Sequence, residues 1–284
     1  MPVATTFPKI HRYEARVSDF FVNAYLVETE NAVVAVDAAL ANSDAQALRR
    51  KIDKEIKKPL HSVLLTHGHP DHYTGIAELT KGLDVPIYST QGALDFAKEE
   101  DERKTEVAIA IFGPEFPKRR AFPNSILKEG DTVRCDGVTF ELRDYGPGES
   151  DDDALWVTKI AGVDHAFIGD IAYNNMHCFF RDLHAKEWLG SLDRLRREFN
   201  QTAKLYPGHG EICGVEVSHW NRGYILTFTD TLHDLLQGRD HLEPAEKDVL
   251  VAKMQTYLPN TKLLFLLTYE LDDTIRLLKA KGVV

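Results

Sequence analysis

The sequence lacks several features that would place it in a specialised class of protein. It has three cysteines in 284 residues, Cys135, Cys178 and Cys213, and none of them forms a CxxC pair. Cysteines so widely separated favour reduced thiols in an intracellular protein over a disulfide framework or a cysteine-bound metal. An apolar core must therefore hold the chain together, and its length and 43% hydrophobic residues allow one.

Long apolar runs and an excess of positive charge are also missing. No window approaches the roughly twenty apolar residues of a membrane helix, and residues 1–17 lack the apolar stretch of a secretion signal. The net charge of -10 opposes general binding to phosphate backbones. The compact basic run KRR at 118–120 is more typical of a solvated loop. We therefore expect a cytoplasmic protein that binds neither membranes nor nucleic acids.

Strand-like and helix-like segments alternate along the first part of the chain. Residues 21–37 contain two β-rich runs separated by ETEN, which predicts a hairpin. Residues 43–56 have an apolar stripe at helical spacing, with Ser43 or Asp44 as the candidate cap. A short apolar strand is expected at 62–66. This order of elements predicts a layered α/β architecture.

The same alternation continues beyond the middle of the chain. Residues 132–145 predict a second hairpin that turns at Asp136–Gly137. Two more strands are expected within 154–170, and a helix with one apolar face at 187–199. Between the two halves, residues 91–126 leave two alternatives open, a flap over a site or a helix packed on the sheet.

The last part of the chain, 215–284, is almost wholly helical in pattern. We expect one domain over residues 1–214 and a helical extension over 215–284 that packs on it. An aromatic stripe that includes Trp220 and Tyr224 leaves open whether the extension packs on its own domain or on a second subunit in a homodimer.

The segment THGHPDH, at 66–72, has the densest set of candidate metal ligands in the sequence. Imidazole and carboxylate groups are the usual protein ligands of zinc and similar ions. His67 and His69, two residues apart at a strand end, can face one ion, and a turn can direct Asp71 and His72 at a second. Four such residues within six positions predict a metal site rather than a loop with coincidental histidines.

This segment resembles the HxHxDH signature of the metallo-β-lactamase superfamily. Further elements of that family follow in the same order, GPGES at 146–150, FIGD at 167–170 and YPGHG at 206–210. The resemblance covers residues 20–215. It implies an α/β fold, the αββα sandwich, with the site at one edge between two sheets.

The resemblance also implies a ligand set for two zinc ions: His67, His69, Asp71, His72, Asp170 and His209. In that set His67 and His69 hold the first ion, and His209 completes the second. Asp170 bridges the two ions, and Asp71 and Asp170 are the expected catalytic carboxylates. A metal-bridging hydroxide would be the nucleophile, because two ions lower the pKa of water and polarise a carbonyl or phosphoryl oxygen.

The sequence departs from the family at Glu149, where many members have the histidine of PGH[ST]. A glutamate can replace that ligand, since a His, His, Glu set is a known catalytic zinc arrangement. The added negative charge should raise the pKa of bound water and makes manganese or iron suitable beside zinc. The alternative is that Glu149 faces solvent. The acidic run at 151–153 could substitute as ligands, but we expect it to cap the next strand, hold a histidine ring or be solvated.

Other candidates lie around the ligand set. Asp37, at a strand end, is expected to support a ligand histidine. In the loop after Asp170, His177 and Tyr173 are the expected substrate-binding residues, and Asn174 and Asn175 could donate hydrogen bonds to an oxyanion.

These observations favour a metal-dependent hydrolase that acts on a small-molecule ester, lactone, thioester or amide. The apolar residues of 91–126 suggest a substrate with an acyl or aromatic portion. Two alternatives remain open, a phosphodiesterase or nuclease of the same superfamily, and a non-hydrolytic di-iron redox or binding protein. The acidic charge of the chain counts against the nuclease.

Overall fold

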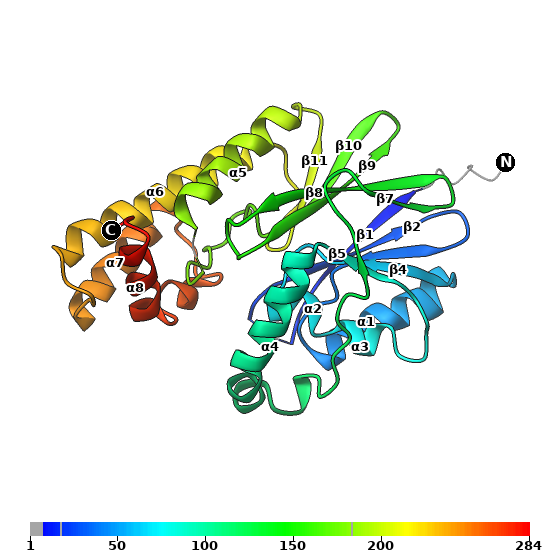
Figure 1. The fold of residues 1–284 in the computed structure, drawn as a ribbon, viewed down its shortest axis with the longest axis horizontal. Helices are drawn as coiled ribbons and strands as arrows, with labels where there is room; N and C mark the ends of the chain where they lie inside the picture. The colour runs from blue at the N-terminus through cyan, green and yellow to red at the C-terminus, as the bar shows by residue number, and fades with distance from the viewer. Residues whose placement is uncertain (1–7, 18, 183) are drawn as a thin grey trace.

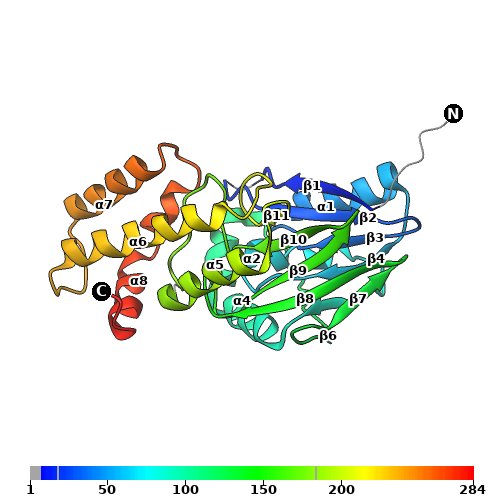
Figure 2. The same ribbon diagram turned by 90° about the horizontal axis from the view of Figure 1, so that it is seen from above.

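Two β-sheets lie face to face, with helices on their outer faces (Figures 1 and 2). The structure is a computed structural model, and it describes residues 8–17, 19–182 and 184–284. Within this part of the chain no helix combines the length and apolar character that crossing a bilayer requires.

The first sheet is built from the N-terminal half of the chain and has six strands in sequential order. They are β1 (Lys9–Glu14), β2 (Asn23–Glu28), β3 (Val33–Val36), β4 (Leu60–Leu64), β5 (Ile87–Ser89) and β6 (Ser125–Ile126). Strands β1 to β3 pair antiparallel, and β3 to β6 pair parallel. The hairpin predicted over 21–37 is therefore confirmed as β2 and β3.

The second sheet comes from the middle of the chain, in the order β11-β10-β9-β8-β7. Its strands are β7 (Thr132–Cys135), β8 (Val138–Gly146), β9 (Asp153–Ile160), β10 (Val163–Gly169) and β11 (Lys204–Pro207). Asp136 and Gly137 both have positive φ, 48° and 80°. That conformation belongs to a type I′ turn, whose twist suits a tight hairpin, and the predicted hairpin is confirmed.

Helices connect the strands and cover the sheets. The helices before the second sheet are α1 (Asn42–Arg50), the π-helical η1 (Lys51–Ile56), α2 (Pro70–Tyr73), α3 (Ile76–Leu79), α4 (Gln91–Phe112) and η2 (Gly113–Glu115). The helix predicted at 43–56 is present as α1 and η1, but its predicted cap is wrong. Ala41 is the N-cap residue and makes no side-chain cap. Asp44 instead accepts a hydrogen bond from the Tyr13 hydroxyl, at 2.7 Å.

Alternation of side chains along the strands produces apolar layers on both faces of each sheet. Between the sheets lie residues such as Tyr25 and Phe140. Leu48 of α1 packs on the outer face of the first sheet. Trp188 of α5 (Ala185–Glu198) packs with Ile168 on the outer face of the second. The predicted αββα sandwich is confirmed.

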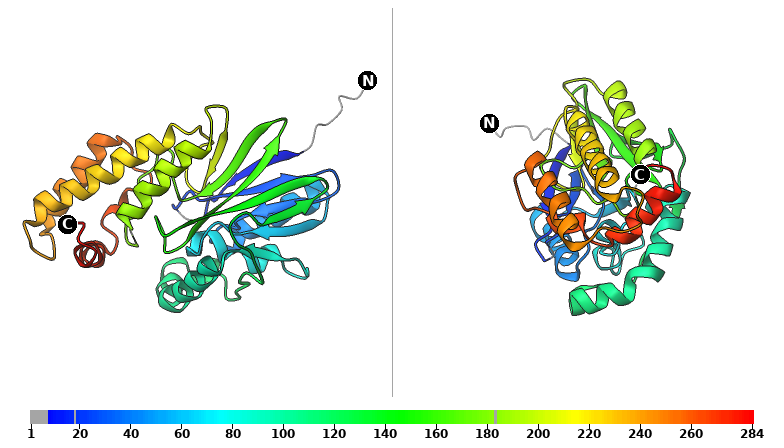
Figure 3. Two further views of the ribbon diagram at one scale, coloured as in Figure 1. Left: turned by 45° about the horizontal axis from the view of Figure 1, so that its top comes forward. Right: turned by 90° about the vertical axis from the view of Figure 1, so that its left-hand side faces the viewer.

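The C-terminal extension is helical and lies at one end of the molecule (Figure 3). Its elements are α6 (Val217–Leu236), α7 (Pro244–Tyr257), η3 (Leu264–Leu267) and α8 (Leu271–Ala280). Tyr224 and Phe228 of α6 are buried in the same apolar cluster as Trp188 of α5. The aromatic stripe predicted from the sequence therefore packs on the chain's own second sheet layer.

The segment 91–126 contains one long helix, α4. Phe96 and Ala97, in its first turns, are buried, whereas Val107 and Ile111, towards its C-terminal end, are 51% and 62% exposed. Of the two alternatives, the packed helix is therefore correct for the first half of α4. The second half borders a pocket described below.

Candidate metal centre

Four of the predicted ligands lie on the loop that follows β4 and on the short helix α2 that continues it. His67 and His69 precede α2, and Asp71 and His72 lie in its first turn. Pro70 is the first residue of α2, a position where its fixed φ suits a helix and its missing N–H costs nothing. The loop also needs Gly68, because a Cβ there would lie 2.6 Å from the backbone nitrogen of Ala97. Helix α4 thus packs directly against the ligand loop.

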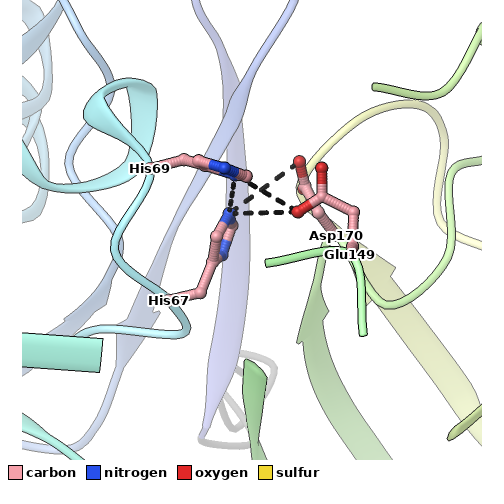
Figure 4. A group of neighbouring side chains, drawn as sticks. All are labelled: His67, His69, Glu149 and Asp170. Carbon is pink, nitrogen blue, oxygen red and sulfur yellow. Dashed lines mark hydrogen bonds and ion pairs between the residues drawn. The ribbon is translucent and has the colours of Figure 1, made fainter. Parts of the chain in front are cut away.

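The remaining predicted ligands come from the second sheet. Glu149 lies between β8 and β9, Asp170 directly follows β10, and His209 follows β11. These strand ends meet the loop after β4 at one edge of the sandwich, where side chains of both sheets point towards one another (Figure 4). The structure therefore brings all seven predicted ligands together.

Four of these side chains form a first group, which Figure 4 shows: His67, His69, Glu149 and Asp170. Nδ1 of His69 lies 3.2 Å from Oε2 of Glu149 and 3.1 Å from Nε2 of His67. The same Glu149 oxygen lies 3.9 Å from Nε2 of His67. Glu149 is fully buried, so the alternative in which it faces solvent is wrong.

The second group consists of Asp71, His72 and His209. Nε2 of His209 lies 3.3 Å from Oδ2 of Asp71, and Nε2 of His72 lies 3.8 Å from the same oxygen. Asp170 contacts this group too, with His209 at 3.2 Å and His72 at 3.5 Å. Asp170 therefore lies between the two groups, in the position that a bridging ligand requires.

Buried atoms without partners test whether these residues suit a metal. Among the described residues, Nε2 of His72, Oε2 of Glu149 and Oδ1 of Asp170 are buried and have no hydrogen-bond partner. Leaving such groups unpaired in the interior is costly. Four imidazoles and three carboxylates form a donor set suited to zinc, iron or manganese. The site therefore fits divalent ions.

Hydrogen bonds on the outer side of the rings fix the orientation of the histidines. Nδ1 of His72 lies 2.9 Å from Oδ2 of Asp37, which also accepts hydrogen bonds from the backbone and hydroxyl of Thr66. Asp37 therefore contacts one of the predicted ligand histidines on the side of the ring away from the other ligands. Such partners hold the ring and its tautomer in place for metal binding.

A second supporting carboxylate, Asp182, was not found from the sequence. Its Oδ2 lies 3.0 Å from Nε2 of His69, and its Oδ1 accepts a hydrogen bond from Arg181 at 2.8 Å. Asp182 lies 113 residues after His69 along the chain. It is a single aspartate in a loop and belongs to no recurring pattern, so no local signal marked it.

Burial and pairing shift the pKa values of the side chains. Burial alone would lower the pKa of His69, but the carboxylates of Glu149 and Asp182 outweigh it and raise that pKa to about 10. In the same way Asp170 and Asp71 raise the pKa of His209 to about 9. Burial raises the pKa of Glu149 to about 7, although His69 acts in the opposite direction. Without a bound cation, the site therefore holds protons at neutral pH.

A cavity of about 480 Å³ lies over the two groups. His69, Asp71, Asp170 and His209 line one end of it, and most of the other lining residues are apolar. Tyr173 also lines the cavity. Its hydroxyl lies 2.8 Å from Oδ2 of Asp170 and 3.0 Å from Oε1 of Glu149. The two groups are thus reached from an apolar pocket.

The structure contradicts the substrate-binding role predicted for His177. Its side chain is fully buried, with Nδ1 2.5 Å from the Tyr224 hydroxyl and Nε2 3.0 Å from the Asn260 carbonyl oxygen. Both ring nitrogens are used in packing the C-terminal extension, and His177 does not line the cavity. The side chain of Asn174 donates to the backbone of Glu211.

The acidic run 151–153 has supporting roles, as expected, but the expectation that some of it is merely solvated is wrong for Asp152, which accepts a hydrogen bond from the Thr90 hydroxyl. Asp153 accepts hydrogen bonds from the backbone nitrogen of Glu149 and the hydroxyl of Ser150. Asp151 lies 2.6 Å from the ring of His184. The two hydrogen bonds of Asp153 shape the turn that presents Glu149.

The fold and the site define a class of proteins, the αββα proteins with a divalent-metal centre at the sandwich edge. A family model described as the metallo-beta-lactamase superfamily matches residues 17–209, and the chain belongs to this superfamily. A solved beta-lactamase domain protein from Burkholderia ambifaria has 20% sequence identity and a TM-score of 0.62. The similarity covers 99% of this chain and 91% of that one, and it shows the shared fold.

Two curated relatives match parts of the chain. The uncharacterized protein YobT of Bacillus subtilis is 33% identical over 121 residues, 40% of this chain and 49% of YobT. This chain thus spans about half the length of YobT. A metallo-beta-lactamase type 2 of Bacillus cereus is 20% identical over 211 residues, 74% of this chain and 72% of the enzyme. Members of the superfamily are mostly metal-dependent hydrolases.

Proposed function

We propose that this protein is a metal-dependent hydrolase of a small ester, lactone, thioester or amide that carries an apolar acyl or aromatic portion. The observation that supports it is the clustering of seven metal-type ligands, four of which, His69, Asp71, Asp170 and His209, line a largely apolar cavity. Such a cavity admits an apolar group while its polar end receives the bond to be cleaved.

Each ligand has a place in this proposal. His67, His69 and Glu149 would hold a first ion, and Asp170 would be shared with a second, which Asp71, His72 and His209 complete. Bound divalent ions supply Lewis acidity and lower the pKa of water. Zinc is the ion we propose, since it suits mixed imidazole and carboxylate ligands, with manganese or iron as substitutes.

Tyr173 is the residue that we propose contacts the substrate. Burial raises the pKa of its hydroxyl well above the ordinary value, and the neighbouring Asp170 adds to that rise. The hydroxyl therefore stays protonated. Its one proton faces Asp170 and Glu149 in this structure, and it would be free to donate to an oxygen that gains negative charge once bound ions occupy those carboxylates. Its ring stacks on that of His209, with centroids 5.1 Å apart, which fixes its direction.

Charges around the cavity favour this proposal over a phosphodiesterase. Among the described lining residues Lys104 is the one lysine or arginine, and it is ion-paired with the buried Glu100. A phosphodiester substrate needs several positive groups along its backbone. The pocket offers an apolar surface instead.

A paired measurement of metal content and activity tests the proposal. Protein reconstituted with zinc should contain one to two ions per chain and hydrolyse at least one class in a panel of esters, lactones, thioesters, amides and β-lactams. Glu149→Ala should lose metal and activity, whereas Asp151→Ala, which removes an exposed carboxylate two residues away, should lose neither. Less than one ion per chain together with inactivity on every class would refute the proposal, as would turnover confined to phosphodiesters.

A further inference from the structure

The end of the cavity away from the metal groups is formed by three phenylalanines from distant parts of the chain. Phe20 precedes β2, Phe112 ends α4, and Phe265 belongs to η3. The ring centroids of Phe20 and Phe112 are 5.9 Å apart, and those of Phe20 and Phe265 are 5.6 Å apart, edge to face. These three rings, which we call the phenylalanine wall, form an apolar surface that is partly open to solvent, since Phe265 is 46% exposed.

Helix α4 runs from the metal centre to this wall. Near its start, the ring of Phe96 contacts the ring of His69, with centroids 5.2 Å apart. Further along, the cavity is lined by Lys104, Ala108 and Ile111 before Phe112 is reached. From Lys104 to Phe112 the helix advances about 12 Å at 1.5 Å per residue. The cavity therefore extends along the helix as well as over the metal groups.

Exposed aliphatic side chains occur along the same stretch of α4. Val107 is 51% exposed and Ile111 is 62% exposed, and both line the cavity. Grouped apolar surface of this kind typically marks a binding site. Ile109, 48% exposed, lies on the same helix but does not line the cavity. The helix thus carries a lining isoleucine and a matched non-lining one.

The C-terminal extension completes the apolar end. Phe265, Leu266 and Tyr269 line the cavity, yet they lie well beyond residue 209, where the superfamily match ends. The catalytic groups therefore come from the matched part of the chain, and part of the pocket wall comes from outside it. The extension therefore shares the apolar end of the pocket with residues of α4 and the segment before β2.

Charges at the apolar end are few. Lys104 lies between this end and the metal groups and is ion-paired with Glu100, which also pairs with Arg103. The other charged lining residue outside the metal groups is the exposed Asp19, next to Phe20 in the sequence. An acidic side chain beside the wall disfavours a ligand with a second negative charge at its far end.

We propose that the phenylalanine wall, Ile111 and η3 form a subsite for a neutral, linear aliphatic chain, the acyl arm of the substrate. The role of the chain as an acyl arm rests on the proposed hydrolase function. The binding of an aliphatic chain at this subsite does not depend on that function. An extended chain advances about 1.2 Å per bond, as extended backbone does. The 12 Å stretch of α4 therefore accommodates roughly ten carbon–carbon bonds.

Calorimetric binding of straight-chain primary alcohols tests the subsite without any turnover. Affinity for the zinc-loaded protein should rise about fourfold with each added methylene, the value for full burial, and level off near decanol. A 1,ω-diol of the same length should bind more weakly, because in either orientation one hydroxyl would meet the apolar end. Affinity that is independent of chain length would overturn the proposal.

Matched variants locate the site. Ile111→Ala and Phe265→Ala should each weaken binding of decanol about sixteenfold, roughly the loss of two methylenes of contact, and change butanol binding little. Ile109→Ala should leave both affinities unchanged. A filling variant, Ile111→Trp, should shift the best chain to a shorter one. Equal effects of the two alanine substitutions on α4 would place the chain elsewhere and refute the assignment.

Hydrolysis assays then separate the two proposals. Chain-length-dependent binding of alcohols in a protein that hydrolyses no ester, lactone, thioester or amide would refute the hydrolase and keep the subsite. Hydrolysis whose kcat/KM is the same for acetyl and decanoyl esters of one alcohol would keep the hydrolase and refute the subsite.

Discussion

Nε2 of His69 lies 3.0 Å from Oδ2 of Asp182, on the side of the ring that faces away from the other predicted ligands. The opposite nitrogen, Nδ1, is thereby directed at Glu149 and His67. The carboxylate that orients this ligand comes from a loop between the second sheet and α5. Metal binding as proposed for the first group would therefore depend on a residue outside the family motifs.

We expect Asp182→Asn to weaken binding of the first metal ion about tenfold or more, the usual effect of removing such a partner. The substitution keeps the shape of the side chain but removes the charge that favours the correct tautomer. Competition with a chelating dye measures the affinity. Asp193→Asn, at a surface ion pair with Arg222, is the control and should have no effect. Unchanged affinity in Asp182→Asn would show that His69 needs no such support.

Substitutions of Glu149 should separate loss of a ligand from a change of charge. Glu149→Ala should lose one ion and most activity, because it removes an oxygen 3.2 Å from His69. Glu149→His should keep the metal and move the pH optimum of activity to lower pH, since fewer anionic ligands leave the ions more strongly Lewis acidic. The measurement is a pH–rate profile with metal analysis. An unchanged profile in Glu149→His would contradict the charge argument.

Metal binding should release protons and strengthen as pH rises. The pKa of His69 is raised to about 10 and that of His209 to about 9, so both rings are protonated near pH 7.5 in the metal-free protein. Because metals bind only the deprotonated forms, each ion must displace protons. Affinity should increase with pH until it passes those values, and fall below neutrality.

Calorimetry in two buffers of different ionisation enthalpy measures this release. We expect at least about two protons released per fully loaded chain at pH 7.5, one from each of these rings. A heat of binding that is the same in both buffers would mean that the metal-free site is already deprotonated.

Gly208 should be intolerant of any side chain. A Cβ at this position would lie 2.0 Å from Oδ1 of Asp170 and 2.6 Å from Cε1 of His72, so both ligands would have to move. We expect Gly208→Ala to reduce metal content and to destabilise the fold by about 1–3 kcal/mol, as overpacking does. Gly190→Ala, in α5 with nothing described within 4 Å, should be neutral or stabilising. Metal analysis and denaturant unfolding measure both, and normal metal content in Gly208→Ala would contradict the close approach.

Tyr173→Phe should lower kcat about a hundredfold, within the range for loss of one oxyanion donor. The phenyl ring can still stack on His209, so metal content and the thermal unfolding temperature should change little. Steady-state kinetics on the substrate found in the panel measure the effect. A loss of metal with no separate effect on kcat would show instead that the hydroxyl serves the ligands.

Local sequence patterns predicted the structural elements that are determined by residues close together along the chain. The two hairpins follow from alternation and, for the second, an Asp-Gly turn, and the ligands follow from motifs a few residues long. The parts missed depend on contacts between distant segments. His177 looked available because its loop borders the site, but α6 and the segment before η3 occupy both of its nitrogens. Asp182 and Phe265 reach the site only through the packing of α4 and the extension, which no short pattern encodes.

Each metal group takes ligands from both sheets, one set from residues 67–72 and the other from 149–209. Bound ions would thus join two halves of the chain that otherwise meet through an apolar interior. An ion that binds only the folded state raises the stability of that state by mass action. Ions held between the two sheets would also oppose their separation. The supply of metal would then govern how long the protein survives proteolysis, apart from any turnover.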